Sequence, residues 1–208
     1  MPHRPSAALA LIEAGNRLDA RGLAPATAGN YSARLEDGNI LITVSGSHKG
    51  RLTDAQLMRV APDGSALEPK KSSAETLLHC LIYGVDPAVG AVLHTHSITG
   101  TVLSRALAGA DGIDFVDYEL LKVFPGVSTH EGRVIMPLVD NSQDMVALAA
   151  QMRPLLERQR PLLPAFYIRG HGLYAWGATV EAAENIVEGC EFLLACAWEE
   201  LKFKGIPR

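Results

Sequence analysis

The alternation of apolar and polar positions divides the chain into short helices and short strands. Several segments place apolar residues three and four positions apart, which is the period of a helix with one buried face. The first such helix runs from Ser6 to about Arg21, with Leu9, Ile12 and Leu18 toward the core and Ser6 as its expected N-cap. The segments with this helical character are residues 6–21, 53–60, 74–84, 97–107, 141–158 and 180–205.

Other segments are short, apolar and bounded by turn residues, which is typical of strands. Residues 30–35 and 39–44 are separated by Asp37-Gly38, a strong hairpin signal, so we expect them to pair in antiparallel fashion. The other expected strands are residues 91–96, 127–139, 165–170 and 173–177. Because short strands alternate with helices and one hairpin is present, the pattern predicts an α/β fold with a mixed, mainly antiparallel sheet flanked by helices.

Length and composition narrow the class of protein. The 208 residues contain no internal repeat or linker, which predicts a single domain spanning 1–208. The net charge of −4 lacks the basic excess typical of nucleic-acid binding, and no apolar run approaches the roughly 18 residues that cross a membrane. Three cysteines without a CxxC pair favour buried thiols and a cytoplasmic location.

The sharpest chemical feature is the HxH pair in VLHTHS. On a strand, His94 and His96 point to the same face, where two imidazoles can converge on one metal ion. A catalytic zinc usually has three protein ligands, and His171 is the best third candidate because Gly170 and Gly172 flank it. The alternative for each of these residues is an ordinary structural histidine.

Two carboxylates are candidates for proton transfer. Glu75 lies at the start of a predicted helix, where it could simply complement the helix dipole. Glu119 lies in the largely apolar run VDYELLKVF, where its alternative role is a surface acid paired with Lys122. A carboxyl group near a metal or apolar walls can act as an acid or a base.

Three small polar clusters are suited to holding an anion. Turns and helix starts offer backbone N–H groups and hydroxyls to a phosphate, although each cluster by itself is equally compatible with a plain turn or cap. The clusters are Ala28-Gly29-Asn30, Ser45-Gly46-Ser47 with His48 and Lys49, and Lys71-Ser72-Ser73 at a helix start. The chain has neither a phosphate loop of the nucleoside triphosphatases nor a GxGxxG after a strand, which disfavours nucleotide binding.

Five motifs in this order resemble the class II aldolase/adducin family over nearly the whole chain: AGNYS, TVSGSHKGRL, KKSSAETLLH, AVLHTHS and IRGHGLYAWG. The resemblance implies a class II aldolase-like, three-layer fold, commonly a homotetramer. It also implies one zinc ion per subunit on His94, His96 and His171. The phosphate-binding residues that it implies are Gly29, Asn30, Ser45, Gly46, Ser72 and Ser73. A small phosphorylated ketose would then be the substrate.

The resemblance leaves the reaction to be chosen. The family's aldolases place their acid/base glutamate directly after a Ser-Ser pair, whereas here Ala74 separates Ser73 from Glu75. Its dehydratases use a glutamate downstream of the HxH pair, for which Glu119 is the match, and SGSHKG with GHGLYAWG resembles this branch. We therefore expect dehydration of a ketose 1-phosphate with Glu119 as the preferred proton-transfer group. The alternatives are retro-aldol cleavage with Glu75, epimerisation, or an adducin-like binding module without catalysis.

Overall fold

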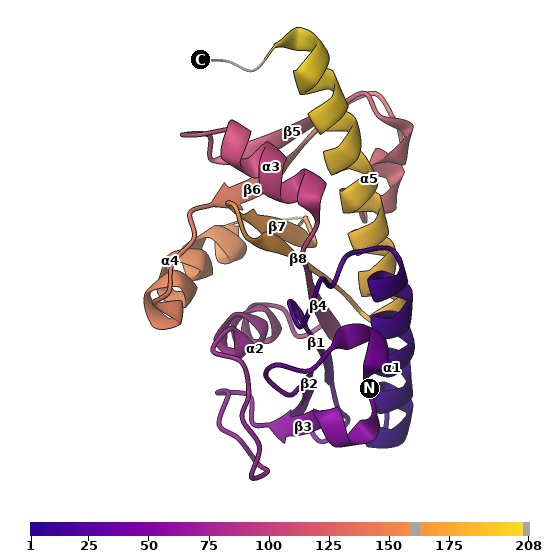
Figure 1. Cartoon of the computed structure of the whole chain (residues 1–208), viewed down its shortest axis with the longest axis vertical. Coiled ribbons are helices and arrows are strands. Elements are labelled where there is room, and N and C mark those ends of the chain that lie inside the picture. Colours follow the sequence, from indigo (N-terminus) through magenta and orange to yellow (C-terminus); the bar gives the residue numbers. More distant parts are fainter. Residues whose placement is uncertain (159–162, 206–208) are drawn as a thin grey trace.

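A computed structural model describes residues 1–158 and 163–205, and within them the chain forms one eight-stranded sheet (Figure 1). The strand order is β3-β2-β1-β4-β8-β7-β6-β5. All neighbouring strands are antiparallel except β6 and β7, which run parallel. The strands are β1 Asn30–Arg34, β2 Ile40–Thr43, β3 Leu57–Val60, β4 Ala91–Thr95, β5 Gly112–Val116, β6 Arg133–Val139, β7 Ala165–Ile168 and β8 Gly172–Gly177.

Helices cover both faces of this sheet and complete three layers (Figure 1). The helices α1, α3 and α5 share one apolar core with the sheet, and α2 and α4 share a second core on the opposite face. The helices are α1 Arg4–Ala20, α2 Thr76–Val85, α3 Ile98–Ala106, α4 Met145–Arg158 and α5 Val180–Lys204, with 3-10 turns η1 Lys49–Arg51, η2 Asp54–Gln56 and η3 Glu119–Val123. The predicted mixed, mainly antiparallel, three-layer α/β fold is confirmed.

Strand β4 illustrates how the two cores share the sheet. Leu93 belongs to the core beneath α1 and α5, whereas Val92 belongs to the core beneath α2. Since side chains alternate across a strand, His94 falls on the same face as Val92. The chemistry-bearing residues of β4 therefore face the α2–α4 side of the sheet.

The segment 53–60 was predicted to be a helix, and that prediction is wrong. Only Asp54–Gln56 makes a 3-10 turn, and Leu57–Val60 continues as β3 beside β2. Leu57 packs into one core while Met58 and Val60 pack into the other. A strand covered on both faces carries a continuous apolar run, and such a run cannot be distinguished from a short helix by periodicity alone.

The cap predicted for the first helix also differs. Helix α1 begins at Arg4, and the Ser6 hydroxyl donates to the His3 carbonyl oxygen instead of capping the helix. Leu9 is exposed, and Leu11 with Leu18 forms the buried face. Helix α5 has a side-chain cap, because the Thr179 hydroxyl accepts a hydrogen bond from the Ala182 backbone at its start.

The sequence missed one strand and anticipated the burial of two cysteines. Strand β5 was not predicted, because residues 112–116 merge into an apolar run that ends in the η3 turn. Cys80 and Cys190 are buried as expected, Cys196 is partly exposed, and all three thiols are free. Among the described residues, no helix combines the length and apolar character that crossing a bilayer requires.

Candidate active site

Three histidines converge at the end of β4, on the sheet face covered by α2 and α4. The imidazole centres of His94 and His96 lie 4.6 Å apart, and the His171 ring lies 5.0 Å and 4.9 Å from them. One nitrogen from each ring can be chosen so that all three lie within 4.8 Å of one another. The structure therefore brings together the three histidines that the sequence singled out.

Close backbone approach makes this convergence possible. A Cβ atom at Gly172 would lie 2.3 Å from the Thr95 carbonyl oxygen and 2.7 Å from Cε1 of His94. At Gly29, which has φ +78°, a Cβ would lie 2.4 Å from the His94 carbonyl oxygen. Side chains at either position would push the neighbouring strands away from β4, so both glycines are required for the site to assemble.

The ring of His94 is fixed with one nitrogen free. Its Nδ1 lies 2.9 Å from the Leu173 carbonyl oxygen, which can only accept, so Nδ1 carries the proton. Tyr174 stacks on the ring at 4.1 Å, and Phe166 stacks on Tyr174 at 4.9 Å, so three neighbouring strands contribute one aromatic row. The opposite nitrogen, Nε2, is buried and has no hydrogen-bond partner. That nitrogen carries an unused lone pair.

The other two imidazoles are held by the loops around the sheet. The His96 backbone N–H donates to the Leu23 carbonyl oxygen, which ties the strand end to the loop after α1. His171 lies in the tight turn between β7 and β8, where its N–H donates to the Ile168 carbonyl oxygen. Next to it, the Arg169 guanidinium donates to the backbone carbonyl oxygens of Ser104, Leu107 and Ala110. This anchors the turn to the end of α3.

The donor set fits a divalent transition metal. Burial lowers the pKa of His94 well below its usual range, and burial together with His171 lowers the pKa of His96 to about 4. Both rings are therefore neutral, which is the form that ligates metals. The unpartnered Nε2 of His94 supplies a lone pair in the interior, and three imidazoles suit zinc and its neighbours in the periodic table.

Glu75 lies directly beside the three histidines, just before α2. Its Oε1 is 3.0 Å from Nε2 of His171 and 3.8 Å from Nε2 of His94, and Oε2 accepts a hydrogen bond of 2.5 Å from Nδ2 of Asn30. Burial raises the pKa of this carboxyl, but the hydrogen bond from His171, the electrostatic interaction with the His94 and His171 rings, and the hydrogen bond from Asn30 outweigh burial and hold the pKa at about 2. Glu75 is therefore ionised and placed to accept a proton.

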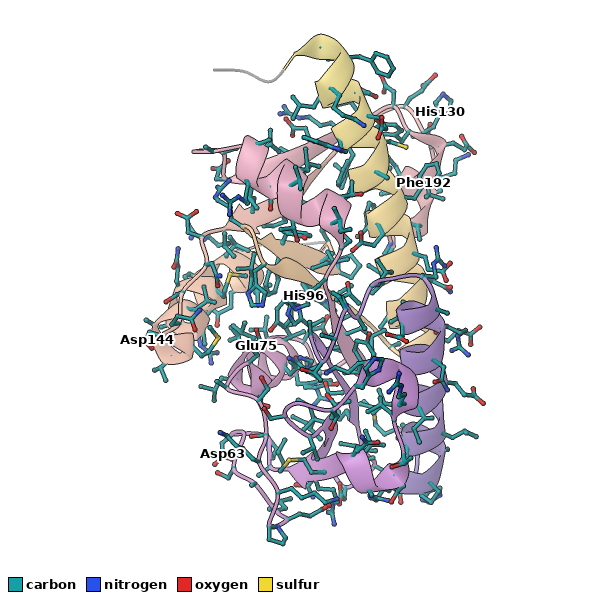
Figure 2. The ribbon with its side chains drawn as sticks, in the orientation of Figure 1. Asp63, Glu75, His96, His130, Asp144 and Phe192 are labelled. Carbon is teal, nitrogen blue, oxygen red and sulfur yellow. The ribbon has the colours of Figure 1, made fainter. Side chains whose placement is uncertain are left out.

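Glu119, the other candidate carboxylate, does not lie beside these histidines in the folded chain. It begins η3, its side chain is 73% exposed, and it contacts Lys122 at 2.5 Å and His130 at 3.6 Å. Figure 2 shows Glu75 and His96 in the middle of the molecule, whereas His130 lies near the end that carries the C-terminal half of α5. A catalytic role for Glu119 stays a prediction, and it requires a site outside its own chain.

The polar clusters meet in a cavity of ≈ 350 Å³ beside the histidines. Ser45 and Lys71 are joined by a backbone hydrogen bond of 3.0 Å, which brings the turn after β2 next to the Ser-Ser pair. Ser72 is the exception among the six predicted phosphate-binding residues, since its backbone bridges to Val44 and it does not line the cavity. The five that do are Gly29, Asn30, Ser45, Gly46 and Ser73, together with Glu75, His96 and His171.

The positive charge of this cavity comes from a buried lysine. Lys49 is 1% exposed, and its Nζ donates to the carbonyl oxygens of Thr27 and Ser47 at 2.6 Å each. Burial lowers the pKa of Lys49 to about 8, against the opposing charge of Glu75. Lys49 thus joins two of the polar turns. The sequence offered it only as a neighbour of the Ser45-Gly46 turn, because a lysine in a polar loop gives no sign of burial.

A second cavity, of ≈ 690 Å³, shares three lining residues with the first: Glu75, His96 and His171. Its far wall carries apolar side chains from Pro25, Ile98 and Val102, and Asn141 and Gln143 complete the rim. The histidines and Glu75 therefore stand between a polar cavity and a partly apolar one.

Comparison with known proteins agrees with this geometry. Residues 9–198 match the family described as the class II aldolase and adducin N-terminal domain. The methylthioribulose-1-phosphate dehydratases of Hahella chejuensis and Pseudomonas aeruginosa are 53% and 51% identical to this chain, covering 94% and 95% of both sequences.

Solved structures give the same answer at the level of the fold. YgbL of Klebsiella pneumoniae, described as an aldolase, epimerase or decarboxylase, superposes with a TM-score of 0.82 at 26% identity, covering 99% of this chain and 94% of that one. The L-fuculose-1-phosphate aldolase of Thermus thermophilus superposes with a TM-score of 0.78 at 24% identity, covering 99% of both chains. The chain belongs to the class II aldolase and adducin family.

Proposed function

We propose that the protein is a zinc-dependent dehydratase that removes water from 5-methylthioribulose 1-phosphate in methionine salvage. The observation that carries the proposal is the meeting of three converging imidazoles, an ionised carboxylate and an anion cavity at one point of the sheet. The substrate comes from relatives that are about half identical to this chain over nearly its full length. The product is the 2,3-diketo-5-methylthiopentyl 1-phosphate.

His94, His96 and His171 would hold the zinc ion, one per subunit. When bound, the ion would polarise the ketone of the substrate and stabilise the charge that develops on its oxygen. The site's own groups carry the proton transfers. Glu75, ionised and next to the histidines, accepts the proton from the carbon beside the ketone. Loss of the next hydroxyl as water leaves an enol, which becomes the diketone without any oxidant or reductant.

The two cavities divide the substrate between them. The polar turns and Lys49 offer N–H groups, hydroxyls and one positive charge to the phosphate. The cavity with Pro25, Ile98 and Val102 accommodates the remaining carbon chain and the apolar methylthio group. The ketone between these two ends then lies next to the histidines and Glu75. This arrangement matches a substrate with a charged end, a reactive centre and an apolar end.

Glu119 enters the proposal through a homotetramer. It belongs to an exposed segment that also carries the apolar side chains of Val116, Leu120 and Ile135, and such residues are usually covered when subunits assemble. We infer that the assembly places Glu119 at the site of a neighbouring copy, where it assists the departure of the hydroxyl. The free thiols of all three cysteines suit a cytoplasmic location.

Product analysis tests the reaction. Purified, zinc-loaded protein is incubated with 5-methylthioribulose 1-phosphate, and the products are analysed by mass spectrometry, with His94→Ala as the control that removes a ligand. A product lighter by one water, formed by the wild type only, supports the proposal. A carbon–carbon cleavage fragment, an isomer of equal mass or unchanged substrate overturns it in favour of an aldolase, an epimerase or a binding module, respectively.

Mixed assemblies test the role of Glu119. The variants Glu75→Gln and Glu119→Gln are each assayed alone and then co-expressed with two different tags, so that mixed oligomers can be purified. If Glu119 serves a neighbouring site, the mixed oligomers contain some sites with both carboxylates and regain part of the activity. Mixed oligomers that are as inactive as both single variants would show that the two groups act within one chain. Full activity of Glu119→Gln alone would show that Glu119 does not act.

A further inference from the structure

A row of buried polar side chains leads from Glu75 into the apolar interior between the sheet and α2. Its members are Asn30, Ser32, His79 and Tyr83, all at most 4% exposed. Asn30 and Ser32 lie on β1, and His79 and Tyr83 lie one turn apart on α2. Four polar groups in one core need a reason, because buried polar atoms destabilise a fold unless each is paired.

These side chains form one continuous hydrogen-bonded chain. Nδ2 of Asn30 lies 2.5 Å from Oε2 of Glu75, and Oδ1 of Asn30 lies 2.5 Å from Nε2 of His79. Nδ1 of His79 lies 2.7 Å from the Ser32 hydroxyl, which in turn lies 2.8 Å from the Tyr83 hydroxyl. Glu75 ends the chain at the metal-binding histidines, and Tyr83 ends it inside the core.

The carboxylate fixes the direction of every bond in this chain. Nδ2 of Asn30 donates to Oε2 of Glu75, so the Asn30 oxygen faces His79. Nε2 of His79 must then carry a proton and donate. Burial lowers the pKa of His79 to about 3, so the ring is neutral and Nδ1 accepts from Ser32. Ser32 therefore accepts from Tyr83.

We propose that His79 is a positioning residue for the reaction, acting through Asn30 to hold the Glu75 carboxylate in its productive orientation. The two amide orientations of Asn30 have nearly the same shape, so packing alone does not choose between them. The donor at Nε2 of His79 holds this orientation from the other side, because the reversed amide would set a second donor against His79 and an oxygen against the Glu75 carboxylate. Glu75 would then lose the bond that holds its Oε2.

This inference rests on the proposed function only through the activity assay. The expected effect is a fall in kcat with little change in KM, because His79 lies behind Asn30 and does not line either cavity. Removal of outer groups that orient active-site side chains typically lowers activity by about 10- to 100-fold. A purely structural role would instead lower the amount of folded protein and leave the kcat of the folded fraction unchanged.

Two amide substitutions separate the two nitrogens of His79. In His79→Gln the amide reaches the place of Nε2 and can still donate to Asn30, whereas in His79→Asn it reaches only the place of Nδ1 and bonds Ser32 alone. We expect His79→Asn to lose about 10- to 100-fold in kcat and His79→Gln to retain most of it, with equal zinc content in both. Equal losses in both variants, or no loss in either, would overturn the proposal.

Nitrogen-15 NMR of the folded wild type gives a readout that depends on neither the variants nor the substrate. The chemical shifts of the His79 ring nitrogens report which of them carries the proton. A proton on Nε2 supports the proposed direction of the chain, and a proton on Nδ1 overturns it. If the wild type lacks dehydratase activity while His79 carries its proton on Nε2, the proposed function fails and the hydrogen-bonded chain stands.

Discussion

Two pairs of a glutamate and a histidine, both within the part of the chain that the structure describes, lie in different environments. Glu75 and His171 lie 3.0 Å apart with side chains 18% and 17% exposed, whereas Glu119 and His130 lie 3.6 Å apart with side chains 73% and 51% exposed. Burial raises the pKa of Glu75, but His171, His94 and Asn30 bring it down to about 2. The hydrogen bond and charge of Lys122 lower the pKa of Glu119, with His130 contributing less.

The difference shows that residue type and proximity do not by themselves make a reactive site. Around Glu75 the backbone of β4 and β8, the aromatic row behind His94 and the amide of Asn30 hold each group in place. Around Glu119 the partners are solvent-exposed side chains, where an ion pair contributes little to stability. The buried pair is organised by its own chain, and the exposed pair is available to another molecule.

Removing the histidine of each pair should give the largest contrast. His171→Ala deletes one of the three converging imidazoles, so we expect loss of bound zinc and a fall in dehydratase activity of about 1,000-fold or more. His130→Ala should keep the full zinc content. Elemental analysis of the purified proteins measures both. Equal zinc in the two variants would place the metal elsewhere.

Removing the charge of Glu75 should give the next largest effect. Glu75→Gln keeps the shape and the bond from Asn30 but cannot accept a proton, so kcat should fall by about 100- to 10,000-fold while zinc remains bound. Steady-state kinetics and metal analysis on one preparation test this expectation. A variant with normal kcat would show that another group removes the proton.

A methyl group on a glycine tests the close packing of the buried site. Gly172→Ala should lower the free energy of unfolding by about 1–3 kcal/mol and weaken zinc binding, because its Cβ collides with Thr95 and His94. Gly126, in the exposed segment between Glu119 and His130, has φ +84° and open space around it. Gly126→Ala should therefore cost about 1–2 kcal/mol of stability through its backbone alone and leave zinc affinity unchanged. Urea unfolding and zinc titration distinguish the two.

A third carboxylate, Glu191 on α5, sharpens the comparison because burial shifts its pKa and no histidine is among the groups that affect it. Burial raises its pKa to about 7, while a hydrogen bond from Ser97 and the charge of Arg21 oppose the rise. A folded-state pKa above the unfolded value of about 4.5 contributes stability at low pH that is lost as the pH rises toward 7 and beyond.

Replacing this carboxyl with an amide should remove that pH dependence. Relative to the wild type, Glu191→Gln should therefore gain stability between pH 5 and pH 8, on the order of 3 kcal/mol at most. Denaturant unfolding at both pH values measures the difference. A gap between the two proteins that does not change with pH would contradict the raised pKa.

The sequence by itself determined the fold class and the three histidines that converge. Period-2 and helical patterns gave the mixed sheet and its helices, since burial on one face imposes those periods. His94 and His96 were found because two residues on one strand face are neighbours by local geometry alone. The segment 53–60 was misjudged because an apolar strand covered on both faces shows neither period.

Only the tertiary structure decided which carboxylate belongs to the site of this chain. The sequence left both Glu75 and Glu119 as candidates and, on the resemblance to the dehydratases, preferred Glu119. Strand pairing places Asn30 opposite His94 and so carries Glu75 to the histidines, while η3 places Glu119 in solvent. The hydrogen-bonded chain through His79 likewise joins residues 49 and 47 positions apart. Such contacts depend on how distant segments pack, and no local pattern encodes them.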